Sequence, residues 1–183
     1  SSATAAVQAI DKRIAIQQVN IQELQKALRD NPLADGSTRE ILIDNEDQAN
    51  LTVSGNWSTL KNASGCYGLS LLSSNNQDKN PQNAVRFNAV IEKSGRYEVY
   101  AYFPRVAGGS SQVGSVFHDG SKSYQVIIKP NQIRIEGQTS GEWILIGEYD
   151  LKKDSKSYLE ISTAQADGIV VADAVLIHPK TIR

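Results

Sequence analysis

The feature that most constrains the fold is an apolar run near the C-terminus that contains a single carboxylate. Residues 168–177 read Gly-Ile-Val-Val-Ala-Asp-Ala-Val-Leu-Ile, and Asp173 is the only charged residue among them. Such a run belongs in the interior, where an ionised carboxylate is tolerated only if it is paired or richly hydrogen-bonded. We therefore expect Asp173 to be a structural anchor that accepts hydrogen bonds from a neighbouring loop, with Arg86 and Arg96 as candidate ion-pair partners.

The composition is that of a globular protein with no strong electrostatic preference. The 183 residues include 19 basic and 20 acidic side chains, which gives a formal net charge of −1. A surface this balanced does not attract nucleic acid or an anionic membrane, and no stretch approaches the roughly 20 apolar residues of a bilayer span. The only cysteine, Cys66, excludes an internal disulfide and a thiolate zinc site. The chain contains no Met, so we expect it to be part of a longer protein.

Two kinds of sequence meet at residues 31–38, which collect Asn, Pro, Asp, Gly and Ser. Before this boundary, apolar residues recur at helical spacing: Val7, Ile10, Ile21, Leu24 and Leu28. Short helices with such narrow stripes are not stable alone in water. We predict a helical segment over residues 1–38 that packs on the following domain or, in preference, on upstream sequence, and a second unit over residues 39–183.

After residue 38 the pattern indicates β-structure. Strands are expected over residues 40–43, 84–91, 96–103, 112–118, 123–129, 132–136, 143–146, 158–163 and 169–177. Glycine-containing turn clusters separate these strands, and helical patterns do not alternate with them, which argues against a doubly wound parallel sheet. The predicted fold is mainly β: an antiparallel, jelly-roll-like β-sandwich preceded by a short α-helical segment.

Alternation in the third expected strand separates its two faces. One face carries Tyr97, Val99 and Ala101, and the other carries Glu98, Tyr100 and Tyr102. Because Tyr100 and Tyr102 share a face with Glu98, we expect them to form an exposed aromatic platform. Tyr97 and Trp143 lie in apolar strand patterns and are expected in the core.

An ordered series of short motifs resembles a known family. The motifs are Ile-Leu-Ile-Asp-Asn at 41–45, Gly-Asn-Trp at 55–57, Gly-Cys-Tyr-Gly at 65–68, Val-Arg-Phe at 85–87, Gly-Arg-Tyr-Glu-Val-Tyr at 95–100, Gly-Glu-Trp at 141–143 and Val-Val-Ala-Asp-Ala-Val at 170–175. Over residues 40–178 the chain is similar to golvesin C-terminal-like domains, which are β-sandwich accessory modules of bacterial secreted proteins, including xanthan lyases. The resemblance implies a non-catalytic role and a secreted or periplasmic location. Asp44, Arg86 and Trp143 lie within these motifs and are expected to be structural.

The first 30 residues resemble a second family. Ala-rich residues 3–10, the Ile-Gln-Gln-Val-Asn sequence at 16–20 and the Leu-Gln-Lys-Ala-Leu sequence at 24–28 are similar to the tail of FAD-dependent oxidoreductases of Bacteroidetes. This resemblance implies that an upstream flavin domain of the same chain is a partner. The chain itself has no Gly-x-Gly-x-x-Gly turn between a strand and a helix, so no cofactor is expected in it.

The aromatic side chains are the candidate ligand-binding groups, because exposed Tyr and Trp rings pack on the apolar faces of sugars. The candidates are Tyr100, Tyr102, Tyr124 and Trp57. The place of Trp57 in the family's Gly-x-Trp motif favours packing over ligand contact. The leading hypothesis is a polysaccharide-binding accessory module, and the alternative is a structural docking domain of an FAD-dependent oxidoreductase with no ligand of its own.

Neither catalysis nor a transition metal is indicated. His118 and Asp119 are interpreted as the end of a strand entering a turn, and no Gly-x-Ser-x-Gly nucleophile elbow is present. The two histidines are too far apart for a recognisable zinc pattern. A weak candidate for calcium remains, because Asp44, Glu46 and Asp47 can supply carboxylate oxygens to a hard cation, although a charged loop after a strand is the plainer interpretation.

Overall fold

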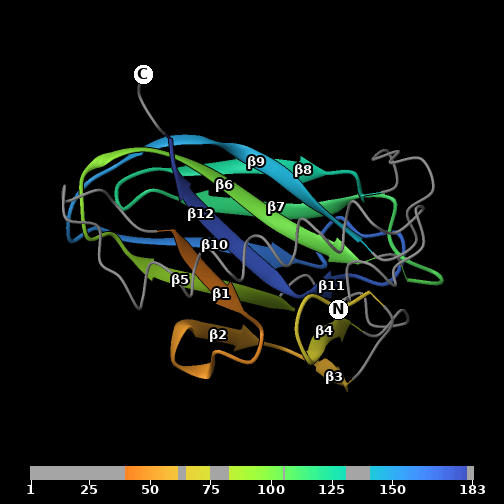
Figure 1. Cartoon of the computed structure of the whole chain (residues 1–183). Helices are drawn as coiled ribbons and strands as arrows, with labels where there is room; N and C mark the ends of the chain where they lie inside the picture. The colour runs from red at the N-terminus through yellow and green to blue at the C-terminus, as the bar shows by residue number, and fades with distance from the viewer. Residues whose placement is uncertain (1–39, 62–64, 75–82, 105, 131–140, 181–183) are drawn as a thin grey trace, which may run out of the picture.

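A computed structural model describes residues 40–61, 65–74, 83–104, 106–130 and 141–180, and these ranges are almost entirely β-structure (Figure 1). Their only helix is the short 3-10 helix η1 (Gln48–Asn50). No helix within these ranges has the length and apolarity that crossing a bilayer requires. The helices predicted over residues 1–38 and the strand predicted over residues 132–136 lie outside the described residues.

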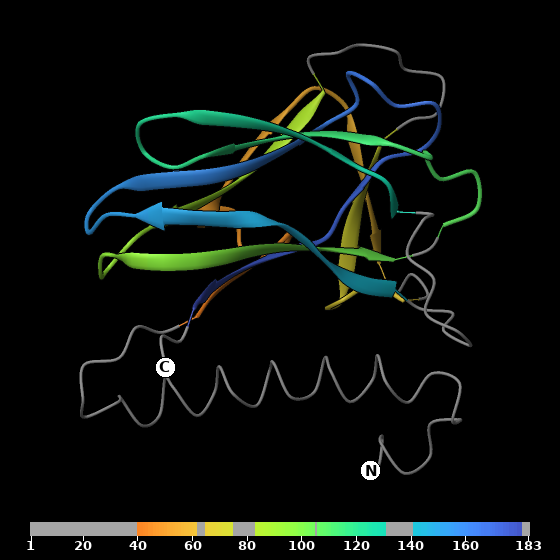
Figure 2. The same ribbon diagram turned by 90° about the horizontal axis from the view of Figure 1, so that it is seen from above.

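Two antiparallel sheets face each other as the layers of a sandwich (Figure 2). The four-stranded sheet has the order β1 (Ile41–Asp44), β12 (Ala174–Pro179), β6 (Gly95–Pro104) and β9 (Gly141–Leu151). The five-stranded sheet has the order β2 (Leu51–Ser54), β5 (Ala84–Val90), β10 (Lys156–Ser162), β7 (Val113–His118) and β8 (Ser123–Ile128). A smaller sheet joins β11 (Val171–Ala172), β4 (Ser70–Ser74) and β3 (Trp57–Lys61). The predicted mainly β, antiparallel architecture is therefore confirmed.

The main core lies between the two larger sheets and is built from alternate residues of their strands. Its most buried members are 0–1% exposed: Val85, Phe87, Tyr97, Val99, Ala101, Phe117, Leu159, Ile161, Val175 and Ile177. Each Val, Leu, Ile or Phe side chain among them stabilises the fold by roughly 1.5–3 kcal/mol when fully buried. The expected core position of Tyr97 is confirmed, and its hydroxyl donates to the carbonyl of Lys93.

The predicted strand over residues 169–177 is two strands. β11 ends at Ala172 and β12 begins at Ala174, so Asp173 separates the three-stranded sheet from the four-stranded one. β2, β3 and β4 are not predicted from the sequence. Most residues of β2 and β3 are exposed, while β4 is buried throughout, so none of the three shows the alternation that marks a half-buried strand. β9 is longer than predicted, because a β-bulge opposite Val99 and Tyr100 interrupts its alternation.

A close backbone approach leaves no room for a side chain at Gly168, the first residue of the apolar run. A Cβ there would lie 2.6 Å from the carbonyl oxygen of Gly108 and 3.0 Å from the amide nitrogen of Ser110. Because backbone atoms cannot rotate away, Gly168→Ala is expected to lower the free energy of unfolding by about 1–3 kcal/mol in urea denaturation. Gly95→Ala is the control, since its Cβ would meet no atom closer than 3.9 Å. Equal losses for the two variants would contradict the prediction.

Candidate functional site

Asp173 is buried at the junction of two sheets, and it anchors a loop as expected. Its residue is 1% exposed, and its Oδ2 accepts a hydrogen bond of 2.8 Å from the backbone N–H of Tyr67. Burial raises the pKa of Asp173 to about 8; the hydrogen bond from Tyr67 opposes this shift, and the charge of Asp44 adds to it. The carboxyl group is therefore largely protonated at neutral pH, which avoids an unpaired charge in the interior.

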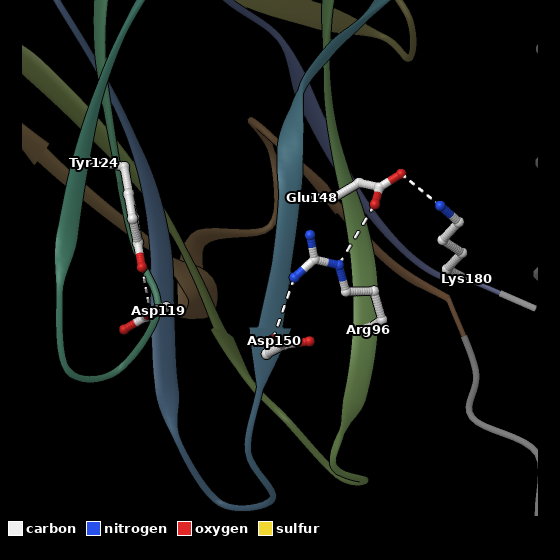
Figure 3. A network of polar contacts seen from close by, with 6 residues as sticks. All are labelled: Arg96, Asp119, Tyr124, Glu148, Asp150 and Lys180. Carbon is white, nitrogen blue, oxygen red and sulfur yellow. Dashed lines mark hydrogen bonds and ion pairs between the residues drawn. The ribbon is translucent and has the colours of Figure 1, made fainter. Parts of the chain in front are cut away.

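The ion pairs suggested for Asp173 are wrong, because both arginines have other partners. Arg86 pairs with Glu160 at 2.7 Å on the five-stranded sheet. Arg96 reaches Glu148 at 3.4 Å and Asp150 at 3.3 Å on the four-stranded sheet, as Figure 3 shows. The side chains of both arginines are exposed, whereas Asp173 is buried. Protonation of Asp173, and not a counter-charge, therefore avoids an ionised carboxylate in the interior.

Two of the three residues suggested for calcium accept local hydrogen bonds. Asp44 accepts a hydrogen bond from the backbone N–H of Glu46 at 3.0 Å, and Asp47 accepts one from the side chain of Asn50 at 2.8 Å. Burial is the main cause that raises the pKa of Asp44. Across the described part of the chain, no group of three or more His, Cys, Asp or Glu side chains is arranged to hold a metal ion.

Tyr102 is not on an exposed platform, and that prediction is wrong. It is 1% exposed, and its hydroxyl donates to the carbonyl of Gly65 at 2.9 Å. Tyr67, Tyr102 and Trp143 form a three-ring cluster with centroids 5.3–5.6 Å apart in edge-to-face contacts. The loop that carries Tyr67 folds over this end of the strand, which alternation alone cannot reveal. Trp143 is buried, as expected.

The other predicted aromatic residues lie apart from one another. Trp57 is half-buried against the main core, and its Nε1 donates to the carbonyl of Ser54 at 3.0 Å. Tyr100 is half-buried on the outer face of the four-stranded sheet, where burial and then Glu98 raise its pKa. Tyr124 is 38% exposed and is the only aromatic among the described large hydrophobic residues that is exposed.

Tyr124 stands at the hairpin between β7 and β8, as Figure 3 shows. Its hydroxyl donates to Asp119 at 3.2 Å, and its ring lies 5.1 Å from that of Tyr149. Two backbone N–H groups of the hairpin also donate to Asp119, so the carboxylate is held in place. Burial raises the pKa of Asp119, but the hydrogen bonds outweigh it and the net shift is downward. The result is an exposed ring with a fixed acceptor at its edge.

The ion pairs at the centre of Figure 3 lie across β6 and β9 and belong to the surface. Glu148 is shared by Lys180, at 2.9 Å, and by Arg96. The hydrogen bond from Lys180 is the main cause that lowers the pKa of Glu148; burial opposes it, and the charge of Lys180 and the hydrogen bond from Arg96 add to it. Exposed pairs of this kind typically contribute little to stability, and we assign them no site.

A second group of polar side chains crosses the outer face of the five-stranded sheet. Antiparallel register places Asn88 of β5 opposite Tyr158 of β10, Tyr158 opposite His118 of β7, and His118 opposite Ser123 of β8. The neighbours Phe87, Leu159 and Phe117 are buried in the core, so the row points outward. We call Arg86, Asn88, Tyr158, His118 and Ser123 the outer-face row.

The outer-face row is held together by contacts between neighbouring strands. Tyr158 on β10 is flanked by Arg86 of β5, whose Cζ lies 4.2 Å from the ring centroid, and by His118 of β7, whose ring stacks at 5.1 Å with an interplanar angle of 18°. His118 Nδ1 lies 3.0 Å from Ser123 Oγ. Asn88 donates to a hydroxyl and a carbonyl of the β2 side at 3.0 and 3.2 Å. Side chains fixed in this way lose little conformational entropy when they bind a ligand.

The sequence analysis did not identify Tyr158 as a candidate. Alternation gives part of the evidence. Residues 157, 159 and 161 face the core, so Tyr158 and Glu160 lie on the opposite face of their strand. The approach of Arg86 and His118 to this ring depends on register between strands distant in sequence, and no local pattern encodes that register.

Comparisons with known proteins agree on the fold. Xanthan lyase of Bacillus sp. (strain GL1) is 28% identical over 138 residues, which are 74% of this chain and 14% of that protein. The structure of Paenibacillus xanthan lyase superposes with a TM-score of 0.68 at 23% identity and covers 80% of this chain and 13% of that one. A family 35 carbohydrate-binding module from Clostridium thermocellum gives a TM-score of 0.55 at 12% identity, covering 78% and 99%. Residues 41–179 match the Golvesin C-terminal domain, and the chain belongs to that family.

Proposed function

We propose that this domain is a non-catalytic accessory module of a larger, secreted bacterial enzyme, and that it binds a polysaccharide through the outer-face row. The observation that carries the proposal is the stack of Arg86, Tyr158 and His118 across three adjacent strands. The shared family with a xanthan lyase segment and the shared fold with a carbohydrate-binding module support the ligand class.

The row has the dimensions and chemistry for an extended sugar chain. Four strands at about 4.8 Å spacing span roughly 14 Å, so a chain lying across them meets one polar side chain per strand. Both flanks of the Tyr158 ring are occupied, so a sugar contacts its hydroxyl edge and the neighbouring nitrogen donors of Arg86 and His118. Glu160 balances the charge of Arg86, which suits hydroxyl-rich ligands of low or moderate charge.

The β7–β8 hairpin connects the outer-face row to the exposed aromatic ring. His118 and Ser123 end the row, while Asp119 and Tyr124 lie on the same hairpin. Tyr124 has the exposed ring that Tyr158 lacks, and Asp119 provides an acceptor beside it. Register pairs Tyr124 with the core-facing Phe117, so its side chain lies on the opposite face of the sheet from the outer-face row, and we assign it no contact with the sugar chain.

The placement of the perturbed carboxyl group supports a non-catalytic role. A general acid needs a raised pKa and access to substrate. Asp173 has the raised pKa but is 1% exposed and faces the interior. The raised pKa of Asp173 therefore results from its burial in the fold. The group does not provide a general acid at a surface where a polysaccharide can bind.

Affinity electrophoresis through gels that contain xanthan, a mannan or a neutral β-glucan tests the proposal. We expect retardation in at least one gel, and we expect Tyr158→Ala and His118→Ala to weaken binding about tenfold or more, which is ~1.4 kcal/mol. The physical reason is that either variant removes one member of the stack and frees the other to move.

Tyr100→Ala is the matched control, because Tyr100 is a half-buried tyrosine on a central strand of the other sheet. It should leave retardation unchanged, and so should Tyr124→Ala, because the side chain of Tyr124 lies on the other face of β8 from the row. Uniform mobility of the native chain in every gel would refute polysaccharide binding. Retardation lost in Tyr100→Ala but kept in Tyr158→Ala would move the site to the four-stranded sheet.

The alternative function is a structural docking domain of an FAD-dependent oxidoreductase. It is favoured by one observation, the apolar part of the outer face of the four-stranded sheet, where Leu145 is 50% exposed. A domain of this kind would show no retardation in any gel, and substitution of Leu145 would change its contact with the upstream domain.

A further inference from the structure

One half of the outer face of the four-stranded sheet is apolar, although it is turned away from the main core; the other half carries Arg96, Glu98, Glu148 and Asp150. Register places Leu42, Leu176, Tyr100 and Leu145 in one line across β1, β12, β6 and β9. The next line contains Ala174, Tyr102 and Trp143. Five residues here form a second buried cluster, with Leu42 and Tyr100 packed against it: Tyr67, Tyr102, Trp143, Ala174 and Leu176.

Apolar residues on both faces distinguish this sheet from an ordinary outer layer. The inner face of β12 carries Val175 and Ile177, and its outer face carries Ala174 and Leu176; all four are at most 5% exposed. An antiparallel sheet with one solvated face alternates apolar and polar residues, whereas a sheet covered on both faces does not. In Figure 2 the five-stranded sheet lies on one side of this sheet, and no described strand lies on the other.

The chain enters this face at its edge. Glu40 precedes β1, an edge strand of the sheet, and its carboxylate is hydrogen-bonded to His178 of β12. The side chain of Glu40 is only 6% exposed. The hydrogen bond that His178 Nδ1 donates to the Glu40 carboxylate raises the pKa of His178 despite its burial. Glu40, the first described residue, is thereby fixed at the edge of this face.

We propose that the outer face of the four-stranded sheet is the docking surface for this chain's own residues 1–38. The stripe of Ile21, Leu24 and Leu28 supplies an apolar face of matching character. Four strands are roughly 14 Å wide, and a helix of about 10 residues covers that distance, so the length suffices. Because the segment is covalently joined at the edge of the face, its effective concentration is far above that of a separate molecule.

Hydrogen exchange of the full chain tests this docking. Backbone amides over residues 20–30 are expected to be protected, and Leu145→Glu or Leu24→Glu should make them exchange at least about tenfold faster. Ile127→Glu, at an exposed aliphatic residue of the five-stranded sheet, and Gln22→Glu, off the stripe, are the matched controls and should change nothing. Unprotected amides in the native chain would overturn the proposal.

Further outcomes separate docking from unfolding and from dimerisation. Amides of β5 and β10 should keep their protection in every variant; if Leu145→Glu unfolds the sandwich, Leu24→Glu decides, because it lies outside the sandwich strands. If sedimentation shows that Leu145→Glu splits a dimer while residues 20–30 exchange as before, a second copy covers the face and the proposal fails. Polysaccharide retardation is measured separately, so either result is independent of the proposed function.

Discussion

Asp173→Asn is expected to flatten the pH dependence of this domain's stability between about pH 4 and pH 8. The folded pKa of Asp173 is about 8, against an ordinary value of 3.8, chiefly because the group is buried. Between these values the folded state binds a proton that the unfolded state releases, so the free energy of unfolding falls as pH rises. This contribution is complete below about pH 4 and is lost as pH passes through the folded pKa.

The slope gives the size of the effect. Where the folded state binds one proton more than the unfolded state, the free energy of unfolding falls by about 1.4 kcal/mol per pH unit. The native domain is therefore expected to be clearly less stable at pH 8 than at pH 5. Urea denaturation from pH 4 to pH 9 measures it. Asn keeps the shape and cannot ionise, so Asp173→Asn should lose most of the slope. Asp44, whose pKa is also raised by burial, and His178, whose pKa is raised by its hydrogen bond to Glu40, should contribute with the same sign.

Asp167→Asn is the control of opposite sign. Hydrogen bonds from the hydroxyl and backbone N–H of Ser111, followed by that from Ser110, lower the pKa of Asp167. Its contribution is present above the unfolded pKa and is lost as pH falls through the lower, folded pKa. A native domain whose stability is constant from pH 4 to pH 8, or an Asp173→Asn variant with the native slope, would contradict the assignment of a protonated carboxyl group.

Phe117→Ala is expected to lower the free energy of unfolding by about 3–5 kcal/mol, because it removes a large side chain from the centre of the core. Phe117 is 0% exposed, and its ring stacks on that of Tyr149 with a centroid distance of 4.3 Å. Tyr149 in turn supports the exposed ring of Tyr124 at 5.1 Å. The three rings lead from the middle of the sandwich to its surface.

The comparison with Tyr124→Ala makes the test specific. Tyr124 is 38% exposed, so its truncation should cost no more than about 1 kcal/mol in the same denaturation experiment. Phe117→Leu, which retains most of the buried volume, should recover much of the loss. A cost below about 1 kcal/mol for Phe117→Ala would show that the three-ring stack is not packed as described.

The strands that could be predicted from the sequence are those with one buried face. β5, β6, β7 and β10 alternate apolar and polar residues, because one face of each meets the core. The sequence also shows that Asp173 needs a partner, but it does not show that the partner is a backbone N–H of Tyr67, 106 positions away. Contacts of this range depend on the assembled topology.

The candidate site was less predictable, for two physical reasons. Tyr102 has the alternation of an exposed residue, yet a loop folds over it and makes it core. Tyr158 has no distinguishing local pattern, yet register brings Arg86 and His118 to either side of it. Exposure and cross-strand neighbours are tertiary properties, and alternation reports only which face of a strand a side chain occupies.

The order of strands in the four-stranded sheet makes the pairing of β1 depend on the synthesis of β12. β1, the first strand, contacts this sheet only through β12, the last strand. Because β12 is translated last of these strands, β1 has no hydrogen-bonding neighbour in this sheet until nearly the whole domain has been synthesised. Deletion of the last few residues of β12 would also remove the hydrogen-bonding partners of β1, so truncation at the C-terminal end of the domain would destabilise its N-terminal strand.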